Sequence, residues 1–180
     1  MDSTITCIRS FLKDHKPLLF TAQNSFHAYG VARRYHLKEE ALVAARLTLE
    51  RSLNFNECGE DLRLISGADL IKLRRYREEC TKVARYCIGQ LKTSENVVYH
   101  RPSYYAYSTE WCYDHFLNRV SDKPSPKLIT DREGFETALK NQGYGNVSQA
   151  NVTRICESVR AEVEAKLKVA IDEVDIVFGS

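Results

Sequence analysis

The apolar residues of this chain recur in steps of three and four along most of its length, which is the spacing of one face of an α-helix. The repeat is clearest over residues 148–173, where it predicts a long amphipathic helix in the C-terminal part of the chain. Its members are Val152, Ile155, Val159, Val163, Leu167, Ile171 and Val174.

Other segments show the same spacing over shorter stretches. Pro17, the polar run 54–59 and the pair Pro124 and Pro126 separate several of them, because proline and polar turn residues interrupt helices. The predicted helices cover residues 4–14, 25–35, 38–52, 68–92, 108–120, 130–141 and 148–173. The pattern therefore predicts an all-α fold of about seven helices, and the β-prone tail 175–178 is too short to form a sheet alone.

Two neighbouring stripes in the segment 38–52 predict how it packs. Leu42, Ala45 and Leu49 form an apolar stripe, and small residues, among them Ala41 and Ala44, lie beside it. Small side chains let a second helix approach closely. We therefore expect segments 25–35 and 38–52 to form a tight helical hairpin, and we expect the other helices to pair in the same way.

Three further signals concern where helices begin and how the longest one packs. Asn24 or Ser25 can cap the helix 25–35, and Ser66 with Asp69 three residues later resembles a capping box before the helix 68–92. Within that helix a seam suited to packing along another helix is predicted at positions 73, 76, 80, 83 and 87.

The segment 94–107 lacks helical spacing and carries an unusual number of tyrosines. Aromatic side chains on loops are frequent at protein interfaces, because they combine a large contact area with a polar tip. We therefore expect Tyr104, Tyr105, Tyr107 and Trp111 to contact a partner. The alternative is that they pack onto the helices as a lid.

Composition and charge narrow the class of protein. Apolar residues make up 43% of the chain and charged residues 28%, as in ordinary globular domains, and the net charge of +2 argues against strong binding to nucleic acid. We expect one helical domain over residues 1–180, with an extended connector at 121–130. No apolar run approaches the roughly 20 residues of a membrane span.

No secretory signal is recognisable at the start of the sequence. The cysteines have wide, irregular spacings without a C-x-x-C pair, which favours reduced thiols in a cytoplasmic or nuclear protein. The six are Cys7, Cys58, Cys80, Cys87, Cys112 and Cys156.

Candidate chemistry is sparse. The phosphate-binding, nucleophile-elbow and metalloprotease motifs are absent, and the pair Glu78 and Glu79 reads as a solvated helix face. We therefore expect a non-enzymatic interaction or adaptor module without cofactor or metal. One alternative is a nucleic-acid-binding regulator that uses the basic helix 72–85. A second is a zinc-binding or thiol-dependent small enzyme that uses Cys112 and His115.

Four segments of the sequence resemble those of a known protein family. They are Ser-Phe-His-Ala-Tyr-Gly-Val-Ala at 25–32, Glu-Glu-Ala-Leu-Val-Ala-Ala-Arg-Leu-Thr-Leu at 39–49, Asp-Leu-Arg-Leu-Ile-Ser-Gly-Ala-Asp-Leu at 61–70 and Leu-Arg-Arg-Tyr-Arg at 73–77, with Cys80 after them. This chain resembles the helical region that follows the BTB/POZ domain in fungal, basidiomycete-type proteins, from about residue 5 to 178.

The resemblance implies a helical companion of a BTB domain, with residues 1–24 as the tail of that preceding domain. It implies homodimers and protein partners that include components of cullin-type ubiquitin ligases. Family members often carry additional cysteines before the tryptophan and a paired cysteine in the last helix. The tyrosine-rich segment and the lone Cys156 stand there in this chain, which argues against an inherited metal site.

Overall fold

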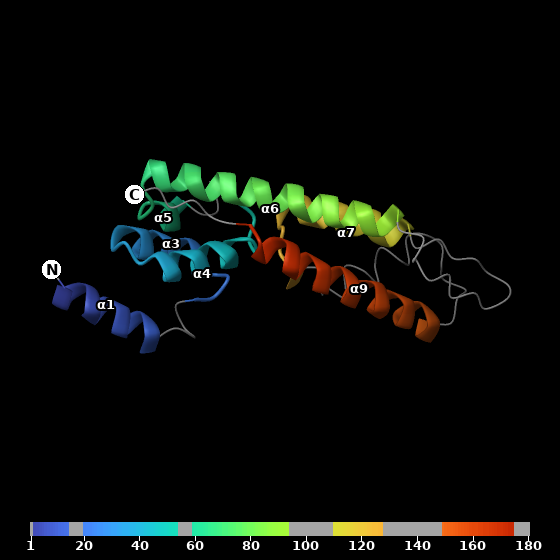
Figure 1. Cartoon of the computed structure of the whole chain (residues 1–180), viewed down its shortest axis with the longest axis horizontal. Coiled ribbons are helices and arrows are strands. Elements are labelled where there is room, and N and C mark those ends of the chain that lie inside the picture. The colour runs from blue at the N-terminus through green and yellow to red at the C-terminus, as the bar shows by residue number, and fades with distance from the viewer. Residues whose placement is uncertain (1, 15–19, 54–58, 94–109, 128–148, 175–180) are drawn as a thin grey trace. The chain divides into compact units, whose positions relative to one another are not determined.

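The computed structural model describes residues 2–14, 20–53, 59–93, 110–127 and 149–174 (Figure 1). Within these ranges the regular structure is helical and contains no β-strand, which confirms the all-α class. The chain divides into two compact units. Unit 1 holds the described residues up to Glu78, and unit 2 those from Glu79 to Val174.

Apart from a one-turn helix at residues 59–62 that the sequence did not predict, the helices follow the predicted segments closely. Unit 1 contains α1 (Asp2–Asp14), α3 (Ser25–Arg34), α4 (Lys38–Thr48), the one-turn α5 (Gly59–Leu62) and the start of α6 (Gly67–Thr93). Unit 2 contains the rest of α6, α7 (Glu110–Asp122) and α9 (Gln149–Asp172). The predicted helix 130–141 and the tail 175–178 lie outside the described residues, so the number of helices and their pairing as hairpins stay predictions.

Helix α4 is shorter than the predicted segment 38–52 because its end tightens. The backbone N–H groups of Glu50 and Arg51 donate to the carbonyl oxygens of Leu47 and Thr48, each at 3.1 Å. These are bonds over three residues, which narrow the last turn and end the regular α-helix. Within the predicted connector, Ser121 and Asp122 still belong to α7, and Lys123 to Ser125 are not helical.

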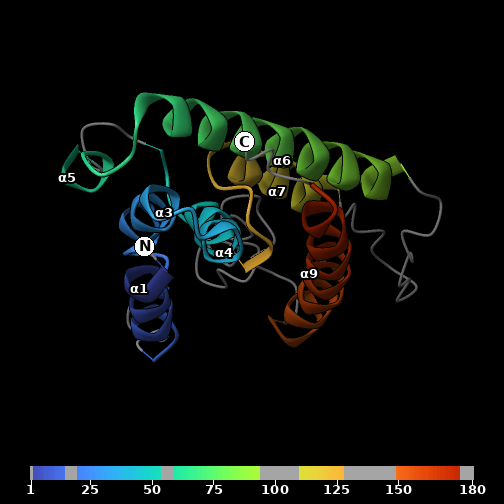
Figure 2. The ribbon, with the colours of Figure 1, turned by 60° about the vertical axis from the view of Figure 1, so that its left-hand side comes forward.

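Helices α3 and α4 pack against each other in unit 1 (Figure 2). The two helices bury mainly small side chains, which permits the close approach that the sequence predicts. No residue between Glu40 and Leu53 is fully exposed, so most of α4 is at least partly covered by the rest of this unit. The small buried residues are Ser25, Ala28, Gly30, Ala32, Ala41, Ala44, Ala45 and Thr48.

The side-chain cap predicted for α3 is wrong. Asn24 occupies the N-cap position but makes no side-chain capping bond, and the Ser25 hydroxyl donates backwards to the carbonyl oxygen of Ala22 at 2.7 Å. A hydroxyl that donates to a preceding carbonyl satisfies an acceptor there and leaves the first N–H groups of α3 without this cap.

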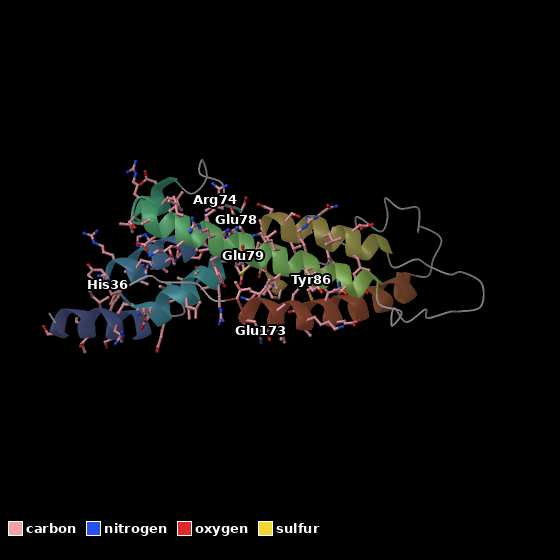
Figure 3. All side chains as sticks on the ribbon, turned by 45° about the horizontal axis from the view of Figure 1, so that its top comes forward. His36, Arg74, Glu78, Glu79, Tyr86 and Glu173 are labelled. Carbon is pink, nitrogen blue, oxygen red and sulfur yellow. The ribbon has the colours of Figure 1, made fainter. Side chains whose placement is uncertain are left out.

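The end of α3 is closed by a left-handed residue. His36 has a φ of 56°, and the N–H groups of Leu37 and His36 donate to the carbonyl oxygens of Ala32 and Arg33 at 2.9 and 3.2 Å (Figure 3). This pair of bonds is a Schellman motif, which usually places glycine at the left-handed position. Leu37, which follows, is 1% exposed and contributes the apolar contact of the motif.

The buried row of α6 differs in part from the predicted seam. Leu73, Tyr76 and Cys80 are buried as predicted, but Val83 and Cys87 are only half-buried. Ala84 and Ile88 are fully buried in their place. A seam that repeats every 3.5 residues stays on one face only if the helix supercoils, whereas a straighter helix drifts away from it.

Unit 2 takes its buried residues from three helices and from Pro124 and Ser125, which follow α7. In all three figures α7 lies beside the later part of α6, and the Arg85 guanidinium donates to the Ser121 hydroxyl at 2.5 Å. In the predicted apolar row of the C-terminal segment, Val163, Leu167 and Ile171 are buried, and the last member, Val174, is half-buried. The buried apolar residues are Cys80, Ala84, Ile88, Tyr113, Phe116, Val120, Pro124, Val163, Leu167 and Ile171.

Gly30 marks the closest approach within unit 1. A Cβ atom at this position would lie 3.0 Å from Leu64 Cβ and 3.1 Å from the Leu64 carbonyl carbon. Contacts this short require a neighbour to move, and one of the neighbours here is backbone. By contrast, a Cβ atom at Gly89 in α6 would meet nothing within 4 Å.

We therefore predict opposite effects for two glycine-to-alanine variants. Gly30→Ala should lower the free energy of unfolding by about 1–2 kcal/mol, because overpacking outweighs the gain in helix propensity. Gly89→Ala should raise it by about 0.5–1 kcal/mol. Urea unfolding followed by far-ultraviolet circular dichroism measures both. An equal gain from the two substitutions would show that α3 does not approach Leu64 this closely.

Candidate functional site

A polar cluster joins the second half of α3 to the beginning of α6, and we call it the α3–α6 cluster. It consists of Tyr29, Arg33, Ser66 and Asp69. The Arg33 guanidinium donates to Asp69 Oδ1 through Nε and pairs with the same oxygen through Nη2, both at 2.7 Å. The side chains of this ion pair are 11% and 17% exposed, so water screens it little.

Ser66 begins α6 as predicted. The backbone N–H of Asp69 donates to Ser66 Oγ at 3.1 Å, and the Ser66 hydroxyl donates to Asp69 Oδ2 at 2.7 Å. The first bond caps a free N–H at the helix start. The second holds the carboxylate near the positive end of the helix dipole, where a negative charge is stabilised.

The surroundings shift two pKa values in this cluster. Burial alone would raise the pKa of the Asp69 carboxyl, but the hydrogen bonds from Ser66 and Arg33 and the nearby positive charges outweigh burial and lower it. Burial raises the pKa of Tyr29 to about 12. The Tyr29 hydroxyl therefore stays protonated and donates to the backbone carbonyl of Asp69 at 3.3 Å.

A buried arginine lies at the C-terminal end of α4. Arg77 of α6 is only 6% exposed. It donates through Nη1 to the carbonyl oxygen of Thr48 and through Nη2 to that of Arg51 at 2.7 Å. The last carbonyl groups of a helix lack partners within it, and a cation is favourable at this end. Arg77 therefore closes α4 from a neighbouring helix.

Arg51 extends this arrangement towards the start of α3. Its guanidinium lies 5.1 Å from the centre of the Phe26 ring and donates to the carbonyl oxygen of Gln23. A guanidinium over an aromatic face is attracted by the ring's negative face. Arg77 and Arg51 together tie the end of α4 both to α6 and to the segment that leads into α3.

These groups are suited to holding helices together and poorly suited to acid–base chemistry. A general acid or base works best with a pKa near the working pH, and the pKa of Asp69 is shifted downward while that of Tyr29 is shifted upward. Within the described ranges, no three or more His, Cys, Asp or Glu residues gather as metal ligands would.

The predicted partner-contact residues are only partly placed. Tyr104, Tyr105 and Tyr107 lie outside the described residues. The backbone of Trp111 lies in the first turn of α7, and its side chain is not described. Tyr113, which the sequence did not single out, is buried on the same helix with Phe116.

The basic helix 72–85 does not present a continuous positive face. Arg77 is buried, and two of the exposed cations pair with neighbouring carboxylates. Arg74 pairs with Glu78 at 2.9 Å, and Lys82 pairs with Glu79 at 2.6 Å. Glu78 and Glu79 are solvated, as predicted, and they reduce the positive potential that a phosphate backbone would meet.

The thiol and zinc alternative gains no support from the residues whose surroundings are known. His115 is half-buried with its ring edge-to-face against Phe116 at 6.0 Å, and the side chain of Cys112 is not described. Burial raises the pKa of the Cys87 thiol, and the opposing effect of Lys166 is smaller. A reactive cysteine needs the opposite shift.

Sequence reasoning missed the partners of these polar groups. It predicted the bond between Ser66 and Asp69 but not the ion pair with Arg33, and it grouped Arg77 with the exposed basic residues. One signal was present: Arg77 is four residues after Leu73 and three before Cys80, so it shares their buried row.

No protein-family model, curated protein or solved structure matches this chain. The resemblance to BTB-associated helical regions therefore stays a prediction. None of the helices in the described ranges has both the length and the apolar character needed to cross a membrane.

We predict that Asp69→Asn destabilises the protein in a pH-dependent way. Because folding lowers the pKa of this carboxyl, its stabilising effect is fully present above about pH 4, its unfolded pKa, and is lost as the pH falls through the folded pKa. At neutral pH the variant should lose about 1–3 kcal/mol of unfolding free energy.

Urea unfolding of the wild type and Asp69→Asn from neutral pH down to pH 3 tests this, since the difference between them should shrink in acid. Glu60→Gln is the control, because Glu60 pairs with Arg63 on the surface at 83% and 75% exposure. It should change stability little. A difference that persists undiminished at the lowest pH would contradict the assigned role of the ionised carboxylate.

Arg77→Met should destabilise unit 1 by about 2–3 kcal/mol, because it removes charged donors from two carbonyl groups while preserving side-chain bulk. Arg74→Met, at an exposed position on the same helix, should have a small effect. Amide hydrogen exchange should also accelerate over residues 45–51 in Arg77→Met alone. Similar stability and exchange in both variants would exclude a capping role for Arg77.

Proposed function

We propose that this chain is a non-enzymatic protein–protein interaction or adaptor module. The observation that carries the proposal is the use made of its buried polar groups. Arg33, Asp69 and Arg77 hold helices of unit 1 together through their side-chain hydrogen bonds. A frame of this kind holds surfaces in fixed positions, which is what an adaptor requires.

We also propose that the chain forms about seven helices and that these helices pack in pairs as hairpins. The packing of α3 on α4 through small residues supports the hairpin pattern. The regular buried row of α9 supports its role as the long C-terminal amphipathic helix.

The proposed contact segment contains Tyr104, Tyr105, Tyr107 and Trp111. Its sequence leads directly into α7, where Phe116 and Val120 are 1% and 0% exposed. A segment attached to a helix with buried anchors loses less conformational entropy on binding than a free loop does. Aromatic residues in such a position are typical of the centre of an interface.

The proposed partners follow from the sequence resemblance. As the helical companion of a BTB domain, the chain would form homodimers and bind components of cullin-type ubiquitin ligases, in the cytoplasm or nucleus. Nucleic-acid binding has less support than protein binding, because two cations of the basic helix are held in ion pairs. Thiol chemistry also has less support, because burial raises the pKa of the Cys87 thiol.

Binding to the purified amino-terminal domain of a fungal cullin, measured by calorimetry, tests the interaction. The triple variant Tyr104→Ser, Tyr105→Ser, Tyr107→Ser should bind roughly tenfold or more weakly, since central aromatic residues each contribute about 1–2 kcal/mol or more. Light scattering on the same samples reports whether the chain dimerises and whether the substitutions change its oligomeric state.

Tyr86→Ser is the matched control. Tyr86 is 70% exposed on α6, outside the proposed segment (Figure 3). It should leave both affinity and oligomeric state unchanged. Equal binding by the wild type and the triple variant would remove the tyrosine segment from the proposal, and no binding by the wild type would remove the cullin as partner.

A further inference from the structure

We draw no further inference here: the strongest candidate, the solvent-exposed face of α6 that carries Ile71 and Tyr86, carries nothing because no contact in the part of the chain that the structure describes shows what covers it.

Discussion

The carboxylate of Asp69 is the group on which the arrangement of unit 1 depends. The carboxylate accepts hydrogen bonds from Arg33 of α3 and from Ser66 at the start of α6. The backbone carbonyl of Asp69 accepts a further hydrogen bond from the Tyr29 hydroxyl. A partly buried charge is stable only when its oxygens are paired, so each of these partners must keep its place. The residue thereby fixes both where α6 begins and how α3 meets it.

Packing and polar contacts support each other around this point. Gly30 lies on α3 between Tyr29 and Arg33 and permits the close approach of α3 to Leu64. At the far end of α4, Arg77 closes the helix by binding its last carbonyl groups. Apolar burial supplies most of the favourable free energy of such a fold, and the charged contacts select one arrangement of the helices.

The sequence predicted the helices well because they depend on local spacing. The buried row of α9 from Val163 onward and the capping pair of Ser66 and Asp69 were both recognised from residues close in the chain. The ion pair of Arg33 and Asp69 spans 36 residues and was not, because spacing within one helix carries no information about contacts between helices. The partners of Arg77 were missed for the same reason: its spacing from Leu73 and Cys80 indicates burial but not which carbonyl groups it binds.

A double-mutant cycle on Arg33 and Asp69 tests most directly whether this ion pair is the joint between α3 and α6. Unfolding free energies of the wild type, Arg33→Met, Asp69→Asn and the double variant give the coupling between the two side chains at neutral pH. Our account predicts a favourable coupling of about 1–3 kcal/mol, as is usual for paired groups in one network. Additive effects of the two single substitutions would contradict it.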